Sequence, residues 1–223
     1  MSRDTQPGND LPADLKDYLP ERTADAWVKL APLVPSSAYL AGGTGLTVHL
    51  HHRVSRDLDF MLRQPEDLAR LRRDLDGVGM FAVTHQDEST LNGVFDDTRV
   101  QFLETTAQKI LGALEVVAGI RVASVEDLMA MKLKVIVDRG ELRDYFDLME
   151  IDRRRIIPVE EGLQLFVERY DPPNPDEYVT TIVKSLGYLD DVADDPALPV
   201  ERGEIERFWS ARHRTILQNL SGY

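Results

Sequence analysis

Hydrophobic and polar positions in the first half of the chain predict a sheet covered by helices. Residues 13–33 have helical spacing interrupted at Pro20, and residues 65–76 place their leucines on one helical face. Five segments have the length and composition of strands: Ser37–Leu40, Asp57–Met61, Phe81–Thr84, Thr90–Phe95 and Arg99–Leu103. The last two are joined by Asp96-Asp97, a turn-forming pair. The order predicts a mixed sheet.

The pattern of the second half is helical throughout. The spacing predicts helices over Ser124–Gly140, Glu141–Ile151, Val159–Tyr170, Glu177–Tyr188 and Glu201–Leu220. Leu128, Met131 and Val135 form the apolar stripe of the first of them. The expected fold class is therefore α+β. We expect a loose tail over residues 1–12, an α/β core over residues 13–122 and a helical domain over residues 123–223 that completes the active site.

Composition narrows the class of protein. Of the 223 residues, 43% are hydrophobic, enough for the core of one large domain or of a domain with a helical extension. The net charge of −13 argues against a protein that wraps nucleic acid or binds an anionic membrane surface. Basic residues are grouped locally, which suits either a groove for a nucleotide or RNA end, or a solvated face.

Cysteine is absent, which excludes disulfides and thiolate metal sites and fits a reducing compartment. Residues 1–12 are polar, and no segment approaches 18 continuous apolar residues, so we expect neither secretion nor membrane insertion. The expected location is therefore the cytoplasm.

A glycine-rich segment suggests a phosphate-binding site. Ala41-Gly42-Gly43-Thr44-Gly45 separates the strand at Ser37–Leu40 from a helix that includes Thr47–Leu50. We expect a turn that places Gly43 and Thr44 at the N-terminus of that helix, where backbone N–H groups bind phosphate. Taken alone, a Gly-Gly pair is more often only a tight turn.

Two aspartates follow the glycine-rich segment. Asp57 and Asp59 alternate with Leu58 and Phe60, so the carboxylates share one face of a strand and the apolar side chains the other. Adjacent carboxylates repel each other unless a divalent cation, usually Mg²⁺, lies between them and the phosphates of a nucleotide. An Asp-x-Asp strand alone is often a solvated face, but the two segments together suggest nucleotidyl transfer.

A second group of charged residues lies in the helical half. Asp144 and Asp147 are three residues apart and share a helix face. The break at Gly140 folds this helix back, so that Lys132 on the preceding helix faces Asp144. Two interpretations are open. The group is either an exposed salt-bridge cluster between two helices, or a lysine that neutralises triphosphate charge beside an acid that accepts a proton.

These motifs together resemble a known family. The chain has Gly42-Gly43-Thr44, then Arg53-x-Ser55-x-Asp57-Leu58-Asp59-Phe60, and far downstream Lys132-Leu133, Asp138-Arg139-Gly140 and Arg143-Asp144-x-x-Asp147-Leu148. In this order, over residues 37–152, they resemble the AbiEii/AbiGii-type nucleotidyltransferase toxins, including the MenT group. The resemblance implies a polymerase-β-like nucleotidyltransferase core with an added helical part, and a role in toxin–antitoxin or phage-defence systems.

The resemblance also implies partners and roles. Several members transfer nucleotides from an NTP to the 3′ end of tRNA, so an NTP, a tRNA or other RNA acceptor and a cognate antitoxin are expected. The implied roles are phosphate contacts for Gly43 and Thr44, Mg²⁺ binding for Asp57 and Asp59, and completion of the catalytic and nucleotide-binding site for Lys132 and Asp144. Some toxins are silenced when the antitoxin causes phosphorylation of the hydroxyl residue in the glycine motif. That residue is Thr44 here, unless Thr44 only caps the helix.

One departure from the family pattern concerns a third carboxylate. Polymerase-β-like enzymes usually place it on a neighbouring strand, where this chain has Gln101, a poor metal ligand. Glu104 or Asp97 could take the position of the third carboxylate only if the strand that contains Gln101 pairs in a different register. Otherwise a second metal ion lacks a ligand, and Asp144 becomes the better candidate for acid/base catalysis. The departure keeps a second function open, a catalytically silent module of the same fold that binds a nucleotide or a protein partner.

Overall fold

The computed structural model describes residues 10–78, 81–138 and 140–221, which form two compact units. Unit 1 contains the residues up to Gln108 together with Ala113–Ser124. Unit 2 contains Lys109–Gly112 and the residues from Val125 onward. Most of the predicted tail, residues 1–9, lies outside the described residues.

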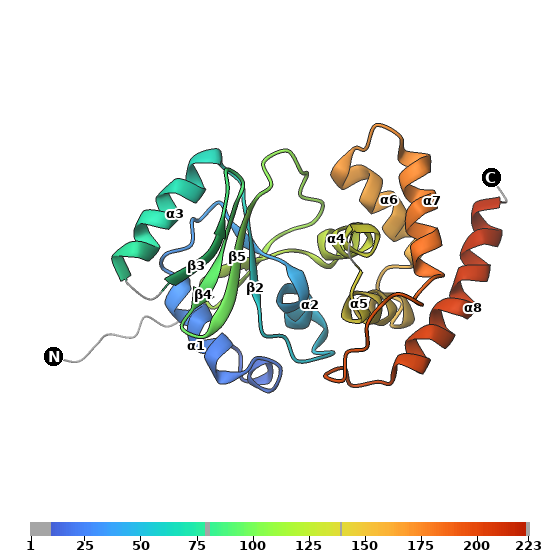
Figure 1. Ribbon diagram of the computed structural model, residues 1–223, viewed down its shortest axis with the longest axis horizontal. Coiled ribbons are helices and arrows are strands. Elements are labelled where there is room, and N and C mark those ends of the chain that lie inside the picture. The colour runs from blue at the N-terminus through green and yellow to red at the C-terminus, as the bar shows by residue number, and fades with distance from the viewer. Residues whose placement is uncertain (1–9, 79–80, 139, 222–223) are drawn as a thin grey trace. The chain divides into compact units, whose positions relative to one another are not determined.

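Unit 1 is built on a seven-stranded sheet with the strand order β3-β4-β5-β2-β1-β7-β6 (Figure 1). The strands are β1 (Tyr39–Leu40), β2 (Leu58–Leu62), β3 (Phe81–Gln86), β4 (Thr90–Phe95), β5 (Thr98–Glu104), β6 (Glu115–Val117) and β7 (Ile120–Val122). Strand β2 pairs in parallel with β5 and antiparallel with β1. The sheet is therefore mixed, as predicted.

Helices α1 and α3 contribute to the apolar core on one face of this sheet. The described helical segments of unit 1 are a 3-10 helix η1 (Ala13–Asp17), α1 (Glu21–Leu30), α2 (Gly42–Leu50) and α3 (Pro65–Val78). On the apolar face, Phe60 of β2 stacks on Phe102 of β5 with ring centroids 5.2 Å apart. Trp27 of α1 and the leucines of α3 belong to the same buried cluster, and Figure 1 shows α3 against the sheet. The opposite face of β2, β4 and β5 keeps half-buried polar side chains.

Two hairpins turn at residue pairs with positive φ. Asp96 and Asp97, at φ of 49° and 65°, join β4 to β5 as expected. Ala118 and Gly119, at φ of 44° and 81°, join β6 to β7, a hairpin that the sequence did not predict. Its strands have three residues each, too few to show a period of two. Strand β7 still extends the sheet, because it pairs in parallel with β1.

Unit 2 is helical, as its spacing predicts. Its helices are α4 (Val125–Asp138), α5 (Leu142–Arg153), α6 (Val159–Tyr170), α7 (Pro175–Leu186) and α8 (Arg202–Ser221). The predicted stripe of α4 is wrong in part, because Leu128 is fully buried but Met131 and Val135 are only half-buried. Helix α4 packs against α5, α6 and α7, so it buries a wider face that includes Met129 and Leu133.

The short segment Lys109–Gly112 is tied to unit 2 by a buried ion pair. Asp127 of α4 and Arg169 of α6 pair with each other, and both side chains are fully buried. The Asp127 carboxylate accepts the N–H groups of Leu111 at 3.0 Å and Gly112 at 3.2 Å. Arg169 donates to the carbonyl of Lys109 at 2.6 Å. These bonds hold the segment in unit 2, although its neighbours in sequence belong to unit 1.

Helix α8 is fastened by a buried aromatic residue and an ion-pair network. Trp209 is fully buried and donates from Nε1 to the carbonyl of Tyr145 at 3.1 Å. Arg212 pairs with Asp152 of α5 at 2.8 Å and with Glu160 of α6. Burial alone would raise the pKa of Glu160, but hydrogen bonds, above all from Arg212, outweigh it and lower that pKa. The network keeps Glu160 ionised.

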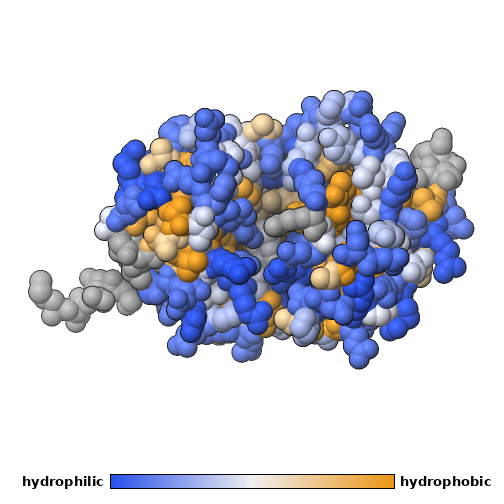
Figure 2. Space-filling view, in the orientation of Figure 1, coloured by the Kyte–Doolittle hydropathy of each residue, from blue (hydrophilic) through white to orange (hydrophobic). Residues whose placement is uncertain are grey.

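The face of the molecule in Figure 2 is mostly hydrophilic, with separate small apolar areas. Within the described ranges, no helix combines the length and the apolar character needed to span a bilayer.

Candidate active site

The glycine-rich segment forms the first turn of helix α2 rather than a separate turn before it. Helix α2 begins at Gly42, with Ala41 as its N-cap. Because alanine has no hydrogen-bonding side chain, it does not cap the N–H groups of this turn. Those N–H groups carry the positive end of the helix dipole, so the turn is suited to bind an anion.

Gly42 lets the carboxylate of Asp59 pack directly on this turn. Its φ of +63° lies in the left-handed region, and a Cβ on Gly42 would be 2.0 Å from Oδ2 of Asp59. Any other residue would clash with the carboxylate and strain the backbone. Glycine is required here because Asp59 approaches the backbone so closely.

Gly43 does the same for Arg53. A Cβ on Gly43 would lie 2.4 Å from Nη2 of Arg53 and 3.3 Å from Oγ of Ser55. The Arg53 side chain is buried, with 8% of the residue exposed. A guanidinium and the N-terminus of a helix both bind anions, so the two together favour a phosphate at this turn. No individual role for Arg53 was predicted from the sequence, although its position at the start of the Arg-x-Ser-x-Asp-x-Asp run could have indicated one.

The two aspartates have the predicted alternation. Leu58 and Phe60 are fully buried, whereas Asp57 and Asp59 are half-buried. Asp59 belongs to β2 and Asp57 immediately precedes it. Since side chains alternate along a strand, the two carboxylates belong to the face opposite the apolar core.

The third carboxylate position holds an amide. Strand β2 pairs with β5 in a register that sets Gln101 opposite Asp59. Glu104 is opposite Leu62, and Asp97 lies in the hairpin turn, so neither replaces it. Across the described ranges, no group of three or more His, Cys, Asp or Glu side chains could hold a metal ion. The aspartate pair still fits Mg²⁺, which is commonly bound by one or two carboxylates together with substrate phosphates.

Thr44 is fully buried. Its hydroxyl hydrogen-bonds to Oγ of Ser55 at 2.8 Å and donates to the carbonyl of Asp57. It does not cap α2, since Ala41 is the N-cap residue. The hydroxyl instead ties the first turn of α2 to the segment that leads into β2, and only the backbone N–H of Thr44 is oriented by the helix as a phosphate donor.

Lys132 lies between two carboxylates, as the helical spacing predicted. Its Nζ is 2.7 Å from Oδ1 of Asp144 and 2.7 Å from Oδ2 of Asp147. The expectation that this cluster is exposed is wrong, because the side chains of Lys132, Asp144 and Asp147 are 8%, 8% and 0% exposed. Asp144 also forms a capping box with Glu141 at the start of α5, which directs its carboxylate toward α4.

Tyr145, next to this cluster in sequence, is a neutral phenol at physiological pH. Burial raises the pKa of Tyr145 to about 12, with further contributions from the charges of Asp191 and Asp144. Its hydroxyl donates to the carbonyl of Ser185 at 3.3 Å. Tyr145 therefore holds α5 to α7 and is not a base.

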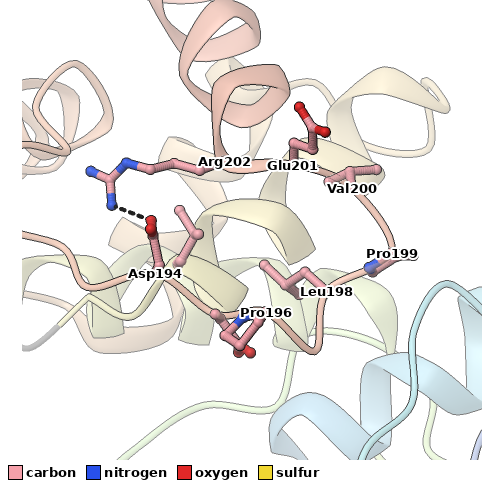
Figure 3. Close-up of a pocket in the computed structure, with 9 residues that line it drawn as sticks. Asp194, Pro196, Leu198, Pro199, Val200, Glu201 and Arg202 are labelled. Carbon is pink, nitrogen blue, oxygen red and sulfur yellow. Dashed lines mark hydrogen bonds and ion pairs between the residues drawn. The ribbon is translucent and has the colours of Figure 1, made fainter.

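The pocket in Figure 3 is a different feature. It has a volume of about 380 Å³ and is formed by Leu142, by the segment between α7 and α8 and by Arg202 at the start of α8. Within it, Arg202 pairs with Asp194 at 3.1 Å. No predicted site residue lines this pocket.

The predicted site residues thus form two groups. Unit 1 brings together Gly43, Thr44, Asp57 and Asp59, and unit 2 brings together Lys132 and Asp144. Arg53 joins the first group and Asp147 the second.

The chain is similar to one uncharacterized relative in sequence and to several solved structures in fold. An uncharacterized protein of Aquifex aeolicus is 29% identical over 186 residues, which cover 81% of this chain and 88% of that protein. The crystal structure of JHP933 from Helicobacter pylori has a TM-score of 0.50 and 19% identity, and covers 95% of each chain. MenT4, a nucleotidyltransferase toxin of Mycobacterium tuberculosis, has a TM-score of 0.50 and 17% identity, with 87% of this chain and 84% of that chain covered. The predicted nucleotidyltransferase fold is confirmed.

A family model agrees with this assignment. The model, described as the nucleotidyl transferase AbiEii toxin of type IV toxin–antitoxin systems, matches residues 31–118 and 100–222. The matched residues include both groups of candidate site residues. The predictions of the family and of an enzyme are confirmed: the chain belongs to the AbiEii family of nucleotidyltransferase toxins.

Proposed function

We propose that this enzyme uses Mg²⁺ to transfer nucleotides from an NTP to an RNA acceptor, such as the 3′ end of tRNA. In this proposal it is a cytoplasmic toxin that a cognate antitoxin controls. MenT4, whose fold is similar, is described as a nucleotidyltransferase toxin, which supports the comparison of function.

The observation that carries the proposal is the first turn of α2. The Asp59 carboxylate packs against Gly42 and the Arg53 guanidinium against Gly43. An anion bound to the N–H groups of this turn would therefore lie beside the Arg53 guanidinium and beside the Asp59 carboxylate, which could bind a metal ion. A triphosphate complexed with Mg²⁺ has both features, because its phosphates are anionic and its metal seeks oxygen ligands.

We assign the chemistry as follows. The 3′-hydroxyl oxygen of the acceptor attacks the α-phosphorus of the NTP, and the bond to pyrophosphate breaks. Asp57 and Asp59 would hold Mg²⁺, which when bound stabilises charge on the phosphates. The N–H groups of Gly43 and Thr44, with Arg53, would hold the triphosphate. Asp144 is the proposed acceptor of the hydroxyl proton. Lys132 is the proposed second cation, and its Nζ lies 2.7 Å from a carboxylate oxygen of each of Asp144 and Asp147.

The experiment uses purified protein, labelled NTPs and total tRNA, with Mg²⁺ or with EDTA. We expect labelled tRNA only with Mg²⁺. Asp59→Ala should lower the rate by about 10³-fold or more, because the metal contributes several kcal/mol to the transition state. Asp74→Ala, which removes an exposed carboxylate of α3, is the control and should leave the rate unchanged.

Two results would contradict the proposal. Normal transfer by a well-folded Asp59→Ala protein would overturn the metal assignment. Transfer of label to protein or small molecules but never to RNA would overturn the acceptor assignment while leaving the enzyme class in place.

A further inference from the structure

A polar row crosses the face of the sheet in unit 1 that is opposite the Phe60–Phe102 stack, and it begins at Asp59. In the register of β2 with β5, Asp59 is opposite Gln101. In the register of β5 with β4, Gln101 is opposite Asn92. Residues opposite each other in a sheet share a face, so these three side chains project from the same side. The row spans about 10 Å, since neighbouring strands lie about 4.8 Å apart.

The neighbouring rows differ from this one in chemistry. On one side Met61 is opposite Leu103, an apolar pair. On the other side Arg99, which is exposed, is opposite Val94. This face therefore carries an apolar pair, two half-buried amides and an exposed guanidinium in successive rows, next to a candidate metal ligand. A nucleotide has the matching parts, namely a base, hydroxyls and a phosphate.

Asn92 supplies the observation that points to a ligand. Its Oδ1 is buried, and no hydrogen-bond donor among the described residues reaches it. A buried carbonyl oxygen without a partner is unfavourable for stability, so such an atom calls for an explanation. A ribose hydroxyl or a base N–H would supply the missing donor.

We propose that Gln101 and Asn92 are the subsite for the terminal nucleotide of the RNA acceptor, with Arg99 at the phosphate that precedes it. This inference rests on the proposed function and adds the place where the acceptor binds. The proposal also gives a function to Gln101, the neutral residue at the position of the third carboxylate. An amide in this position binds a hydroxyl or a base edge, whereas a third carboxylate would attract a metal and repel the acceptor's phosphates.

The test replaces each amide by an apolar side chain of similar shape, in Asn92→Leu and Gln101→Met. Binding of fluorescently labelled total tRNA is compared with binding of the same tRNA shortened by its 3′-terminal nucleotide. Gln86→Met is the matched control, because Gln86 is an exposed amide of β3 opposite Leu91, outside the polar row. Melting temperature and NTP affinity are measured for every variant.

We expect wild-type protein to bind intact tRNA roughly tenfold more tightly than shortened tRNA, and each variant to lose most of that preference. NTP affinity should not change. The melting temperature of Asn92→Leu should stay level or rise, since the substitution removes a buried carbonyl without a partner. A purely structural role for Asn92 predicts the opposite, a lower melting temperature and an unchanged preference.

Three results would overturn the inference. Variants that keep the preference for intact tRNA would show that the row does not bind the terminal nucleotide. Equal losses for both forms of tRNA would show a general effect on the surface. Absence of tRNA binding by the wild-type protein would overturn the inference together with the RNA acceptor, and labelled-NTP transfer to other acceptors would then test the remaining part of the proposed function separately.

Discussion

At the scale of single residues, the two glycines of α2 set how closely charged groups approach the helix. Gly42 admits the Asp59 carboxylate and Gly43 the Arg53 guanidinium. Both contacts leave no room for a Cβ, so the candidate phosphate site depends on the absence of two side chains.

Gly42→Ala should damage the site more than the fold. The new Cβ would displace the Asp59 carboxylate, and the positive φ adds roughly 1–3 kcal/mol of backbone strain. We expect transfer activity to fall by at least the factor seen for Asp59→Ala, with a moderate decrease in melting temperature. Gly77→Ala is the control, because a Cβ there meets nothing within 4 Å and Gly77 lies in helix α3. Full activity of Gly42→Ala would argue against a role for Asp59 beside this turn.

Because the Thr44 hydroxyl is buried, phosphorylation of Thr44 would have to disrupt the packing around it. A phosphate on this hydroxyl would add about −1.5 to −2 charges, and it would break the bonds to Ser55 and Asp57. We expect Thr44→Glu to abolish NTP binding and to lower the melting temperature as well, whereas Thr44→Ser should preserve both. We also expect mass spectrometry of the toxin made with its antitoxin to find phosphate on the Thr44 peptide. An inhibited toxin with unmodified Thr44 would indicate blockade by the partner instead.

The position of a side chain could be predicted where it depends on neighbours in sequence, but not where it depends on packing against distant residues. The alternation of polar and apolar residues along β2 was enough to place Asp57 and Asp59 on one face of the strand. Nothing near Thr44 in the sequence indicates that Ser55 and the Asp57 carbonyl enclose its hydroxyl, because a hydroxyl residue in a glycine-rich turn is usually exposed. The approach of Arg53 to Gly43 depends in the same way on how the chain after α2 returns to its first turn.

At the scale of elements, Lys132 fixes α5 against α4. Its two carboxylate partners lie one helical turn apart on α5, so both point at one ammonium group. Removing the lysine would take away the ammonium group that both buried carboxylates contact.

Lys132→Ala should therefore destabilise unit 2 by about 3–5 kcal/mol, the usual effect of breaking a buried ion pair. Lys134→Ala is the matched control two residues away, since Lys134 and Asp138 form an exposed pair worth about 0.3–0.5 kcal/mol. Urea unfolding of both variants checks the difference. If Lys132→Ala unfolds at the wild-type urea concentration yet has lost NTP use, the lysine acts on the nucleotide and contributes little to the helix pair.

The elements were predicted best where they are long. The range given for α6 matches the structure, and α4, α5, α7 and α8 differ by a few residues at their ends. The β6–β7 hairpin was not predicted, because three-residue strands have no period to detect and their pairing with β1 is not local. The stripe of α4 was misplaced because three neighbouring helices, not one, decide which of its side chains are buried.

At the scale of the whole molecule, 39 acidic residues against 26 basic ones make stability sensitive to acid. Carboxylates that are paired in the folded chain become protonated only at low pH, whereas the same groups in the unfolded chain become protonated at a higher pH. The pKa of Glu160 is held below its ordinary value of 4.5 in this way. The unfolded state therefore binds more protons below that pH, and stability must fall as the pH decreases.

We expect the free energy of unfolding to be level above pH 4.5 with respect to Glu160 and to decrease as the pH falls through its lowered folded pKa. Arg212→Met removes the strongest of the hydrogen bonds that lower this pKa, so the variant should be less stable at neutral pH and should lose less stability on acidification. Arg70→Met, at an exposed arginine of α3, should follow the wild-type curve. Urea unfolding at a series of pH values measures all three. Parallel curves for wild type and Arg212→Met would contradict the assignment.

The four residues Lys109–Gly112 make the two units inseparable by a single cut of the gene. A fragment that stops at Ser124 keeps these residues but loses Asp127 and Arg169, which bind their backbone. A fragment that starts at Val125 keeps the buried carboxylate and guanidinium but loses the amides and carbonyl that satisfy them. A fragment that starts at Val125 is therefore expected to be less stable than the same helices in the full chain, because its buried ion pair lacks these hydrogen bonds.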